Sequence, residues 1–283
     1  RKGCLISMVN LLSLLGVSVA ALAVAATAGG RRKHFELVTG LVYAERPSGD
    51  LKADLYLPEG EGPFPGVVVI HGGGWSGGKP RQMRAVCRRL AQRGYAAMNI
   101  SYRLAPEHLY PAQVHDAKAA VRWLKTNAKT FRVDADRVGA FGYSAGAHLA
   151  MMLGVTKETH GLEGDAPKGA PDTRINAVAA GGLPARFNLW PKSPVITKFI
   201  GKPYAEAKEA WEQASPINHV SKDDPPTFLY HGRRDKLVEP RQAEIMVESL
   251  KAAGVPVELH WMSKRAHVGA FVFDSRAVRL AID

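Results

Sequence analysis

Short apolar runs of strand length alternate along the chain with longer stretches in which apolar residues recur at helical spacing. The runs predict buried strands at residues 67–70, 95–101, 137–141, 175–180, 227–230 and 256–262. The longer stretches predict helices at residues 81–93, 111–129, 147–153 and 240–253, and a closing helix from residue 271 onward. Strands that alternate with helices imply a doubly wound α/β fold, whose mostly parallel sheet is covered on both faces.

Two segments depart from this alternation. Residues 35–44 and 51–57 alternate in part between apolar and polar positions, and Arg-Pro-Ser-Gly-Asp separates them, so we predict an N-terminal antiparallel hairpin. Residues 183–224 are rich in proline and aromatic residues and contain a helical piece at 205–213. This stretch is the candidate for a small cap insertion over the functional site.

The first 28 residues are typical of a targeting segment. Arg1-Lys2 is a basic start, residues 5–26 are almost wholly apolar, and Ala26-Thr27-Ala28 resembles a signal-peptidase site before Gly29. We therefore predict an exported protein, periplasmic or secreted, with a folded domain at residues 35–283. Because the apolar stretch approaches membrane-spanning length, a retained membrane anchor at residues 5–28 stays as the alternative.

Composition narrows the choice of partner and cofactor. The formal net charge is +12, but lysine and arginine are scattered along the sequence, which predicts a solvated basic surface; attraction to an anionic polymer or membrane is the alternative. No zinc-finger or RNA-binding motif is present in the sequence, so a nucleic-acid partner is not expected. Cys4 lies in the leader and leaves Cys87 alone in the domain, which argues against an intrachain disulfide and a cysteine metal site. No cofactor or metal is expected, and the oligomeric state is not predicted.

The candidate nucleophile is Ser144, in the pentapeptide Gly142-Tyr143-Ser144-Ala145-Gly146. The pentapeptide lies between a predicted strand and a predicted helix, and a serine on such a sharp turn exposes its hydroxyl above the sheet. The glycines two residues to either side avoid a clash where strand and helix crowd together. A second match to the pattern, Gly74-Trp75-Ser76-Gly77-Gly78, is followed by Pro80 and lacks the helix.

A serine hydroxyl needs a base, and the base needs a carboxylate to orient it. Active groups of a doubly wound sheet lie on loops that follow strands, and three of the ten histidines do so directly: His71, His231 and His267. We assign the base to His267, just past the last strand, and the carboxylate to Asp235, on the loop after the neighbouring strand. His148 and His260 are less suitable as the base, and Asp223, Asp224 and Glu239 are less suitable as the carboxylate.

The run His71-Gly72-Gly73-Gly74-Trp75 follows the strand at residues 67–70. Glycines allow backbone N–H groups to turn toward an oxyanion without intrusion of side chains. We therefore assign oxyanion-hole donors to Gly73, Gly74 and Ala145, without choosing which two or three of them contribute. Trp75 and Tyr143 are the predicted substrate-binding side chains, and His71 is expected to brace the loop.

Five motifs together resemble the α/β-hydrolase carboxylesterases: residues 71–75, Ser101-Tyr-Arg-Leu-Ala-Pro-Glu107, residues 142–146, His231-Gly-Arg-Arg-Asp235 and His267. The chain is most similar to hormone-sensitive-lipase-like bacterial esterases and to the compact esterases built on His-Gly-Gly-Gly-Trp, over residues 50–270. It departs from the former in the tryptophan that follows the glycines and in having no predicted cap helices between the leader and the sheet. Activity on long acyl chains is therefore not expected.

The resemblance implies a serine carboxylesterase that acts on short-chain or aromatic esters of the acetyl and feruloyl type, in a small-molecule or carbohydrate-linked substrate, through an acyl-enzyme on Ser144. Kynurenine formamidases share the loop motif, so aryl formamide cleavage by the same triad stays as the alternative function. Two other classes fit less well. Residues 73–79 match a phosphate loop, but Pro80 stands where Ser or Thr would hold magnesium. A non-catalytic adhesion relative would be expected to lack a triad residue.

Overall fold

The computed structural model describes residues 34–267. The predicted signal peptide or anchor at residues 1–28 and the predicted closing helix from residue 271 lie outside the described residues. Within the part of the chain that is described, no helix is long and apolar enough to cross a membrane.

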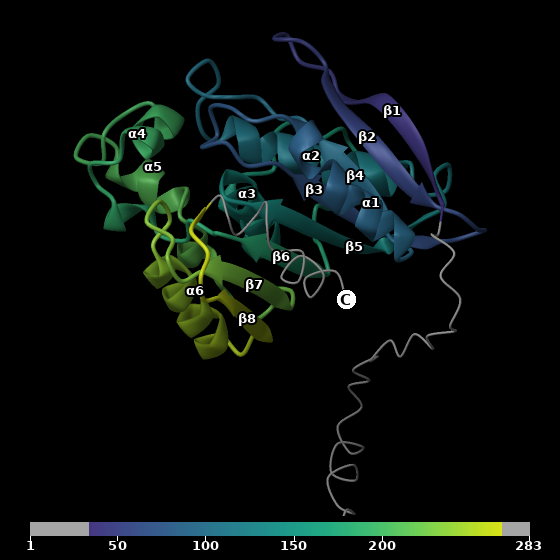
Figure 1. Cartoon of the computed structure of the whole chain (residues 1–283). Coiled ribbons are helices and arrows are strands. Elements are labelled where there is room, and N and C mark those ends of the chain that lie inside the picture. Colours follow the sequence, from purple (N-terminus) through teal and green to yellow (C-terminus); the bar gives the residue numbers. More distant parts are fainter. Residues whose placement is uncertain (1–33, 268–283) are drawn as a thin grey trace, which may run out of the picture. The chain divides into compact units, whose positions relative to one another are not determined.

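The described residues form an eight-stranded sheet in the order β1-β2-β4-β3-β5-β6-β7-β8 (Figure 1). β1 pairs antiparallel with β2, and β2 pairs antiparallel with β4, whereas the remaining pairs are parallel. The strands are β1 (Phe35–Ala44), β2 (Leu51–Pro58), β3 (Phe64–Ile70), β4 (Ala96–Ile100), β5 (Val133–Tyr143), β6 (Ala177–Gly181), β7 (Thr227–Gly232) and β8 (Val257–Met262). The predicted hairpin and the mostly parallel sheet are thereby confirmed.

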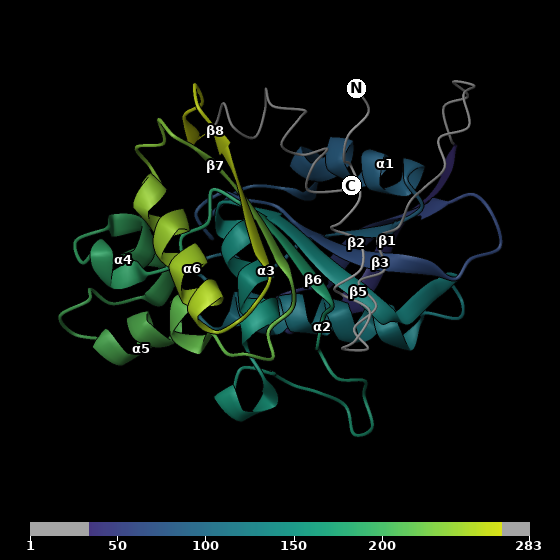
Figure 2. The ribbon, with the colours of Figure 1, turned by 90° about the horizontal axis from the view of Figure 1, so that it is seen from below.

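Helices cover both faces of this sheet, because alternate residues of its strands point to opposite sides. Val68 and Ile70 of β3 belong to a large apolar core that they share with α2 (Ala112–Thr126), α3 (Ala145–Val155) and α6 (Pro240–Ala252). Val67 and Val69 belong to a smaller core shared with α1 (Arg84–Gln92). Figure 2 shows α1 on one side of the sheet and α2 and α3 on the other. The predicted double winding is confirmed.

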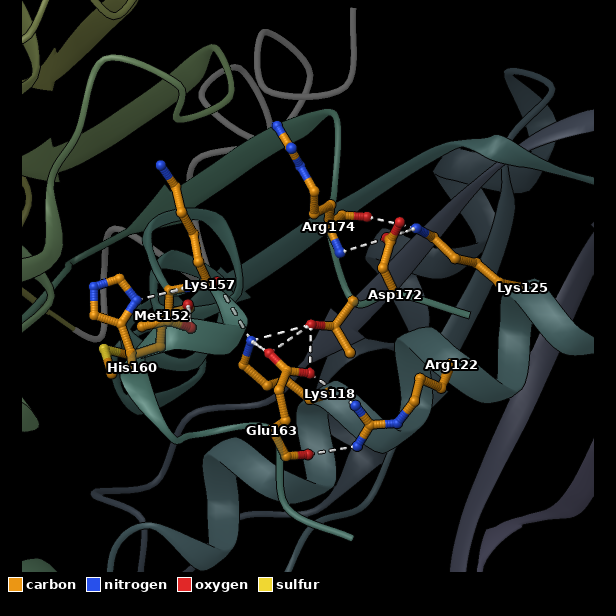
Figure 3. A network of polar contacts seen from close by, with 11 residues as sticks. Lys118, Arg122, Lys125, Met152, Lys157, His160, Glu163, Asp172 and Arg174 are labelled. Atoms are coloured by element: carbon orange, nitrogen blue, oxygen red, sulfur yellow. Dashed lines mark hydrogen bonds and ion pairs between the residues drawn. The ribbon is translucent and has the colours of Figure 1, made fainter. Parts of the chain in front are cut away.

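The predicted cap segment, residues 183–224, follows β6. It contains α4 (Pro194–Ile200) and α5 (Lys208–Gln213), which lie near each other in Figure 1, and 3-10 turns at Phe187–Leu189 and Pro216–His219. The sequence pattern anticipates α5 but not α4. A serine cap begins α4, where Ser193 Oγ accepts the N–H of Ile196 and Pro194 stands at the first helical position.

A buried ionic network holds the segment between α3 and β6 against α2 (Figure 3). Lys118 of α2 is fully buried, and its Nζ donates to Glu163 Oε1 at 2.5 Å and to Thr173 Oγ1 at 3.1 Å. One turn further along α2, Arg122 donates to Glu163 Oε2 at 2.9 Å. The Glu163 carboxylate therefore offsets two cations, and the hydrogen bonds satisfy an ammonium group that has no access to water.

Candidate active site

Ser144 stands on the turn that joins β5 to α3, in a backbone conformation that a non-glycine residue rarely adopts. Its φ is 56° and its ψ is −121°. The turn is held because the Ser144 N–H donates to the Gly181 carbonyl at 2.8 Å. A Cβ at Gly142 would lie 2.1 Å from the Gly146 carbonyl oxygen, and a Cβ at Gly146 would lie 2.1 Å from that of Ile70. The close approach of strand and helix thus requires both glycines.

The imidazole of His267 bridges Ser144 and Asp235. Its Nε2 lies 2.9 Å from Ser144 Oγ, and its Nδ1 lies 2.6 Å from Asp235 Oδ2. Because a carboxylate accepts only, Nδ1 carries the proton of the neutral ring and Nε2 is left as an acceptor for the Ser144 hydroxyl. The three predicted residues are therefore joined in one hydrogen-bonded chain, in which Ser144 Oγ is set up to lose its proton.

The Asp235 carboxylate is buried and held by backbone groups. Its Oδ1 accepts the N–H groups of Leu237 and Val238, each at 2.9 Å, which leaves Oδ2 to face His267. The ring of His231, also buried, donates from Nε2 to the Val238 carbonyl at 2.8 Å. Burial lowers the pKa of His231, so this ring stays neutral and braces the turn that carries the acid. Sequence analysis placed His231 after a strand but gave it no role.

The oxyanion loop, residues 71–75, lies directly against the nucleophile. A Cβ at Gly72 would lie 2.8 Å from the Tyr143 carbonyl oxygen and 3.2 Å from Ser144 Cβ. Gly73 and Gly74 have φ values of 126° and 59°, which glycine adopts without strain. Ala145, the third predicted donor, is the first residue of α3, where backbone N–H groups have no partner within the helix. The structure thus brings the predicted oxyanion residues and Ser144 to one place.

His71 supports the oxyanion loop through contacts with Tyr102. It is buried, its ring stacks on Tyr102 with 4.4 Å between centroids, and its carbonyl accepts the Tyr102 hydroxyl at 3.0 Å. Ser76 lies in the turn that closes the loop, where its N–H donates to the Gly73 carbonyl at 3.3 Å. These contacts assign His71 the bracing position that the sequence suggested.

Trp75 and Tyr143 point into the fold, which differs from the expectation that they line the substrate. Trp75 is 3% exposed, and its ring stacks on Phe199 of α4 with 4.4 Å between centroids. Tyr143 is 5% exposed, and its hydroxyl donates to the carbonyl of His267. Trp75 therefore fastens the oxyanion loop to the cap segment, and Tyr143 fastens the backbone of the base; neither ring offers much surface to a substrate.

Two exposed apolar residues that the sequence analysis did not identify lie next to the oxyanion loop and on the Asp235 turn. Val195 of α4 is 42% exposed, and its Cγ1 lies 3.1 Å from the position of a Cβ at Gly74. Leu237, on the turn that holds Asp235, is 64% exposed. Apolar surface next to a polar reaction centre is typical of a ligand-contacting wall. Within residues 34–267, no group of three or more His, Cys, Asp or Glu side chains is arranged to hold a metal ion.

Comparison with known proteins places this site in a family. The BD-FAE family model matches residues 53–250. Among curated proteins, Esterase LipC of Mycobacterium tuberculosis is 32% identical over 200 residues, which cover 67% of this chain and 49% of LipC. The chain spans about half the length of the first curated relatives that it matches.

Solved structures resemble the chain over most of its length. A truncated form of a carbohydrate esterase from gut microbiota has a TM-score of 0.79 and 25% identity, covering 91% of this chain and 97% of the other. Thermogutta terrifontis esterase 2 phosphoramylated by tabun has a TM-score of 0.73 and 27% identity, with coverages of 89% and 92%. The butyrate-bound form of the same esterase has a TM-score of 0.72 and 26% identity, with coverages of 89% and 91%.

Proposed function

The chain belongs to the BD-FAE family of α/β-hydrolase esterases, and we propose that it is a serine carboxylesterase that forms an acyl-enzyme on Ser144. The observation that carries the proposal is the hydrogen-bonded chain from Ser144 through His267 to Asp235, with Oγ–Nε2 and Nδ1–Oδ2 distances of 2.9 and 2.6 Å. This arrangement suits acyl transfer, because it joins a nucleophile, a base and an orienting carboxylate beside backbone donors.

Each group has one task in the proposed reaction. The Ser144 proton passes to His267 Nε2 while Oγ bonds to the ester carbonyl carbon, and the π electrons move onto the carbonyl oxygen. The N–H groups of Gly73, Gly74 and Ala145 are the proposed donors to that oxyanion. As the tetrahedral intermediate collapses, the bond to the alcohol oxygen breaks and His267 returns the proton to the leaving group. Water then attacks the acyl-enzyme by the same route, which releases the acid and restores Ser144.

We propose short-chain or aromatic esters as substrates, in small molecules or attached to carbohydrate. The likeness to a gut carbohydrate esterase and to a butyrate-bound esterase supports this class. Val195 supports a short acyl group, because its side chain lies over Gly74, one of the proposed oxyanion donors, and we propose that the acyl carbon chain passes beside it. The alcohol oxygen must lie next to His267 Nε2, which is 2.9 Å from Ser144 Oγ, to receive its proton.

The experiment is an ester panel with one matched nucleophile control. Acetyl, butyryl, octanoyl and feruloyl esters, with formylkynurenine as the aryl formamide, are assayed on the wild type and on Ser144→Ala and Ser76→Ala. We expect turnover of acetyl, butyryl or feruloyl esters, abolished by Ser144→Ala and kept by Ser76→Ala. Faster turnover of the formamide than of any ester would replace the proposal by the formamidase alternative.

We also propose that the protein is exported, with the leader removed before Gly29 or kept as an anchor. The basic start, the apolar residues 5–26 and the small residues at 26–28 support this. Cell fractionation followed by N-terminal sequencing tests it. An intact chain in the soluble cytosol would contradict export.

A further inference from the structure

Helix α1 and the turn before it carry several basic residues that have no acidic neighbours in the sequence. Residues 62–106 contain no aspartate or glutamate, but they contain seven lysines and arginines. Six of these seven lie between residues 79 and 93: Lys79, Arg81, Arg84, Arg88, Arg89 and Arg93. They lie on α1 and on the residues that flank it, on one side of the sheet.

These arginines lie opposite the buried side of α1. Val86, Cys87 and Leu90 pack into the smaller apolar core, beneath the helix. On the other side Arg84 and Arg88 of α1 are exposed, and so is Arg81 in the 3-10 turn at Pro80–Met83 that precedes the helix. We call these three side chains the arginine face. Among residues 34–267, none of the three forms an ion pair.

The arginine face works against helix stability. Arg84 and Arg88 are one turn apart, and like charges at this spacing repel each other. Asp54 of β2 lies near Tyr56 and Cys87, and its Oδ1 accepts the N–H of Gly40 at 3.2 Å; within residues 34–267 it forms no ion pair with the arginine face. A solvated helix would normally gain from acidic residues between the basic ones, as α6 does where Arg241 pairs with Glu248 at 3.1 Å. The arginine face has no ion-pair partner within residues 34–267, and such a positively charged surface is suited to an anionic partner.

The folded domain begins next to this face. Phe35, the first residue of β1, packs against the α1 core and lies 5.7 Å from Tyr56 between ring centroids. Burial raises the pKa of the Tyr56 hydroxyl, and the nearby charges of Arg84 and Arg88 oppose that rise. The chain that enters at Phe35 carries Arg31-Arg32-Lys33 and, before them, the apolar residues 5–26. In the sequence, the apolar stretch that we propose to be a leader therefore precedes a residue that packs beside α1.

We propose that the arginine face binds the anionic headgroups of a lipid membrane. Guanidinium groups pair with phosphate in a bidentate manner, and each basic residue near an anionic surface adds to the attraction. The exposed residues between these arginines, Gln82 and Ala85, offer no aromatic ring on which a nucleic-acid base could stack. The face thus suits a surface of phosphates better than single-stranded nucleic acid.

The test compares partition of the full-length protein into phosphatidylcholine vesicles with and without phosphatidylglycerol. The leader carries basic residues of its own, so the effect of the arginine face is measured as the change in the ratio of the two partition coefficients between the wild type and a variant that keeps the same leader. We expect Arg84→Gln/Arg88→Gln to lower the ratio by about 25-fold, at about fivefold per charge. Arg84→Lys/Arg88→Lys should keep most of it. Lys208→Gln/Lys251→Gln, which removes the same charge from α5 and α6, should change it less than about twofold.

Turnover of a soluble acetyl ester by each variant reports that it is folded, since neither arginine belongs to the proposed catalytic groups. If the double variant does not fold, the single variants Arg84→Gln and Arg88→Gln decide, and each should lower the ratio by about fivefold. The wild-type ratio should also fall between about 50 mM and about 500 mM NaCl. Equal ratios for the wild type and Arg84→Gln/Arg88→Gln, or a salt-independent ratio, overturn the proposal. Loss of RNA-oligonucleotide binding with an unchanged vesicle ratio overturns it in favour of a nucleic-acid surface.

Discussion

Trp75 and His148 are joined by a hydrogen bond of 3.1 Å that runs from the indole Nε1 to the imidazole Nδ1. Because Nδ1 accepts, Nε2 carries the ring proton and donates to the Ala214 carbonyl at 2.7 Å. The oxyanion loop, α3 and the end of α5 are thus tied through one neutral ring. A proton on Nδ1 would break the contact with the indole, so the geometry of the oxyanion loop depends on the neutrality of His148.

His148 should make the protein less stable in mild acid. Burial lowers its pKa to about 4, whereas the unfolded chain titrates near ~6.5. The unfolded state therefore binds the proton first, and stability is lost as the pH falls from ~6.5 to ~4. Between pH 7.5 and pH 5 this group alone should cost about 2 kcal/mol. Urea unfolding of the wild type and His148→Gln at both pH values measures it. His148→Gln should shrink the difference by about that amount, and an unchanged difference would contradict the role of His148.

Removal of the proposed nucleophile should abolish turnover without unfolding. Ser144→Ala should lower kcat by on the order of 10⁴–10⁶. Alanine has no hydroxyl to attack, but the backbone bond from residue 144 to the Gly181 carbonyl is kept. Steady-state kinetics and thermal melting separate the two effects. Ser76→Ala is the matched control, and labelling by a serine-directed phosphonate that survives Ser144→Ala but not Ser76→Ala would disprove the assignment.

Asp235→Asn should cost on the order of 10⁴ in kcat. The N–H groups of Leu237 and Val238 bind Oδ1, so they will orient the new amide with its oxygen toward them. Its NH₂ group then faces His267 Nδ1, which must accept, and Nε2 becomes a donor that cannot take the Ser144 proton. The kcat of Asp235→Asn and of His260→Ala are compared. Near-normal turnover in Asp235→Asn would contradict the proposed role of the carboxylate.

Val195 should set the length of the acyl group. Val195→Ala removes the side chain that closes over Gly74, so the ratio of kcat/KM for octanoyl over acetyl esters should rise about tenfold. Val195→Phe should lower the same ratio by a similar factor. Val42→Ala on β1, where the side chain is comparably exposed at 38%, is the control. An unchanged ratio in both Val195 variants would place the acyl wall elsewhere.

Glu163→Gln should destabilise the fold rather than the reaction. The change leaves the buried Lys118 and Arg122 without a counter-charge, a loss of about 3–5 kcal/mol for a buried pair. Burial raises the pKa of Glu163, but Lys118, Thr173 and Arg122 lower it more. The folded pKa is therefore depressed, and the stabilisation is present above the unfolded value and lost as the pH falls through the folded one. Denaturant unfolding measures it, with Glu36→Gln in the exposed pair with Arg132 as a control that should cost less than about 1 kcal/mol.

The sequence was sufficient to predict which residues follow the ends of strands, but not the direction in which the side chain of Trp75 points. Ser144, Asp235 and His267 each follow an apolar run, so parallel pairing alone brings them to one edge of the sheet. The burial of Trp75 could not be predicted, because it depends on Phe199 of α4, a seven-residue helix with too few turns for a periodic pattern. Val195 escaped notice for the same reason. The arginine face did leave a signal, the spacing of residues 81, 84 and 88 within 45 residues that lack acids.

Ser144 and His267 are separated by 123 positions in sequence. During synthesis the hydroxyl, its strained turn and the oxyanion loop all emerge long before the base. A nascent chain that ends before His267 lacks the imidazole, which follows β8, the strand that pairs with β7 in the folded sheet. If the proposed mechanism holds, a chain that is still being synthesised, or one that is cut before its last strand, lacks the base and should not turn over esters.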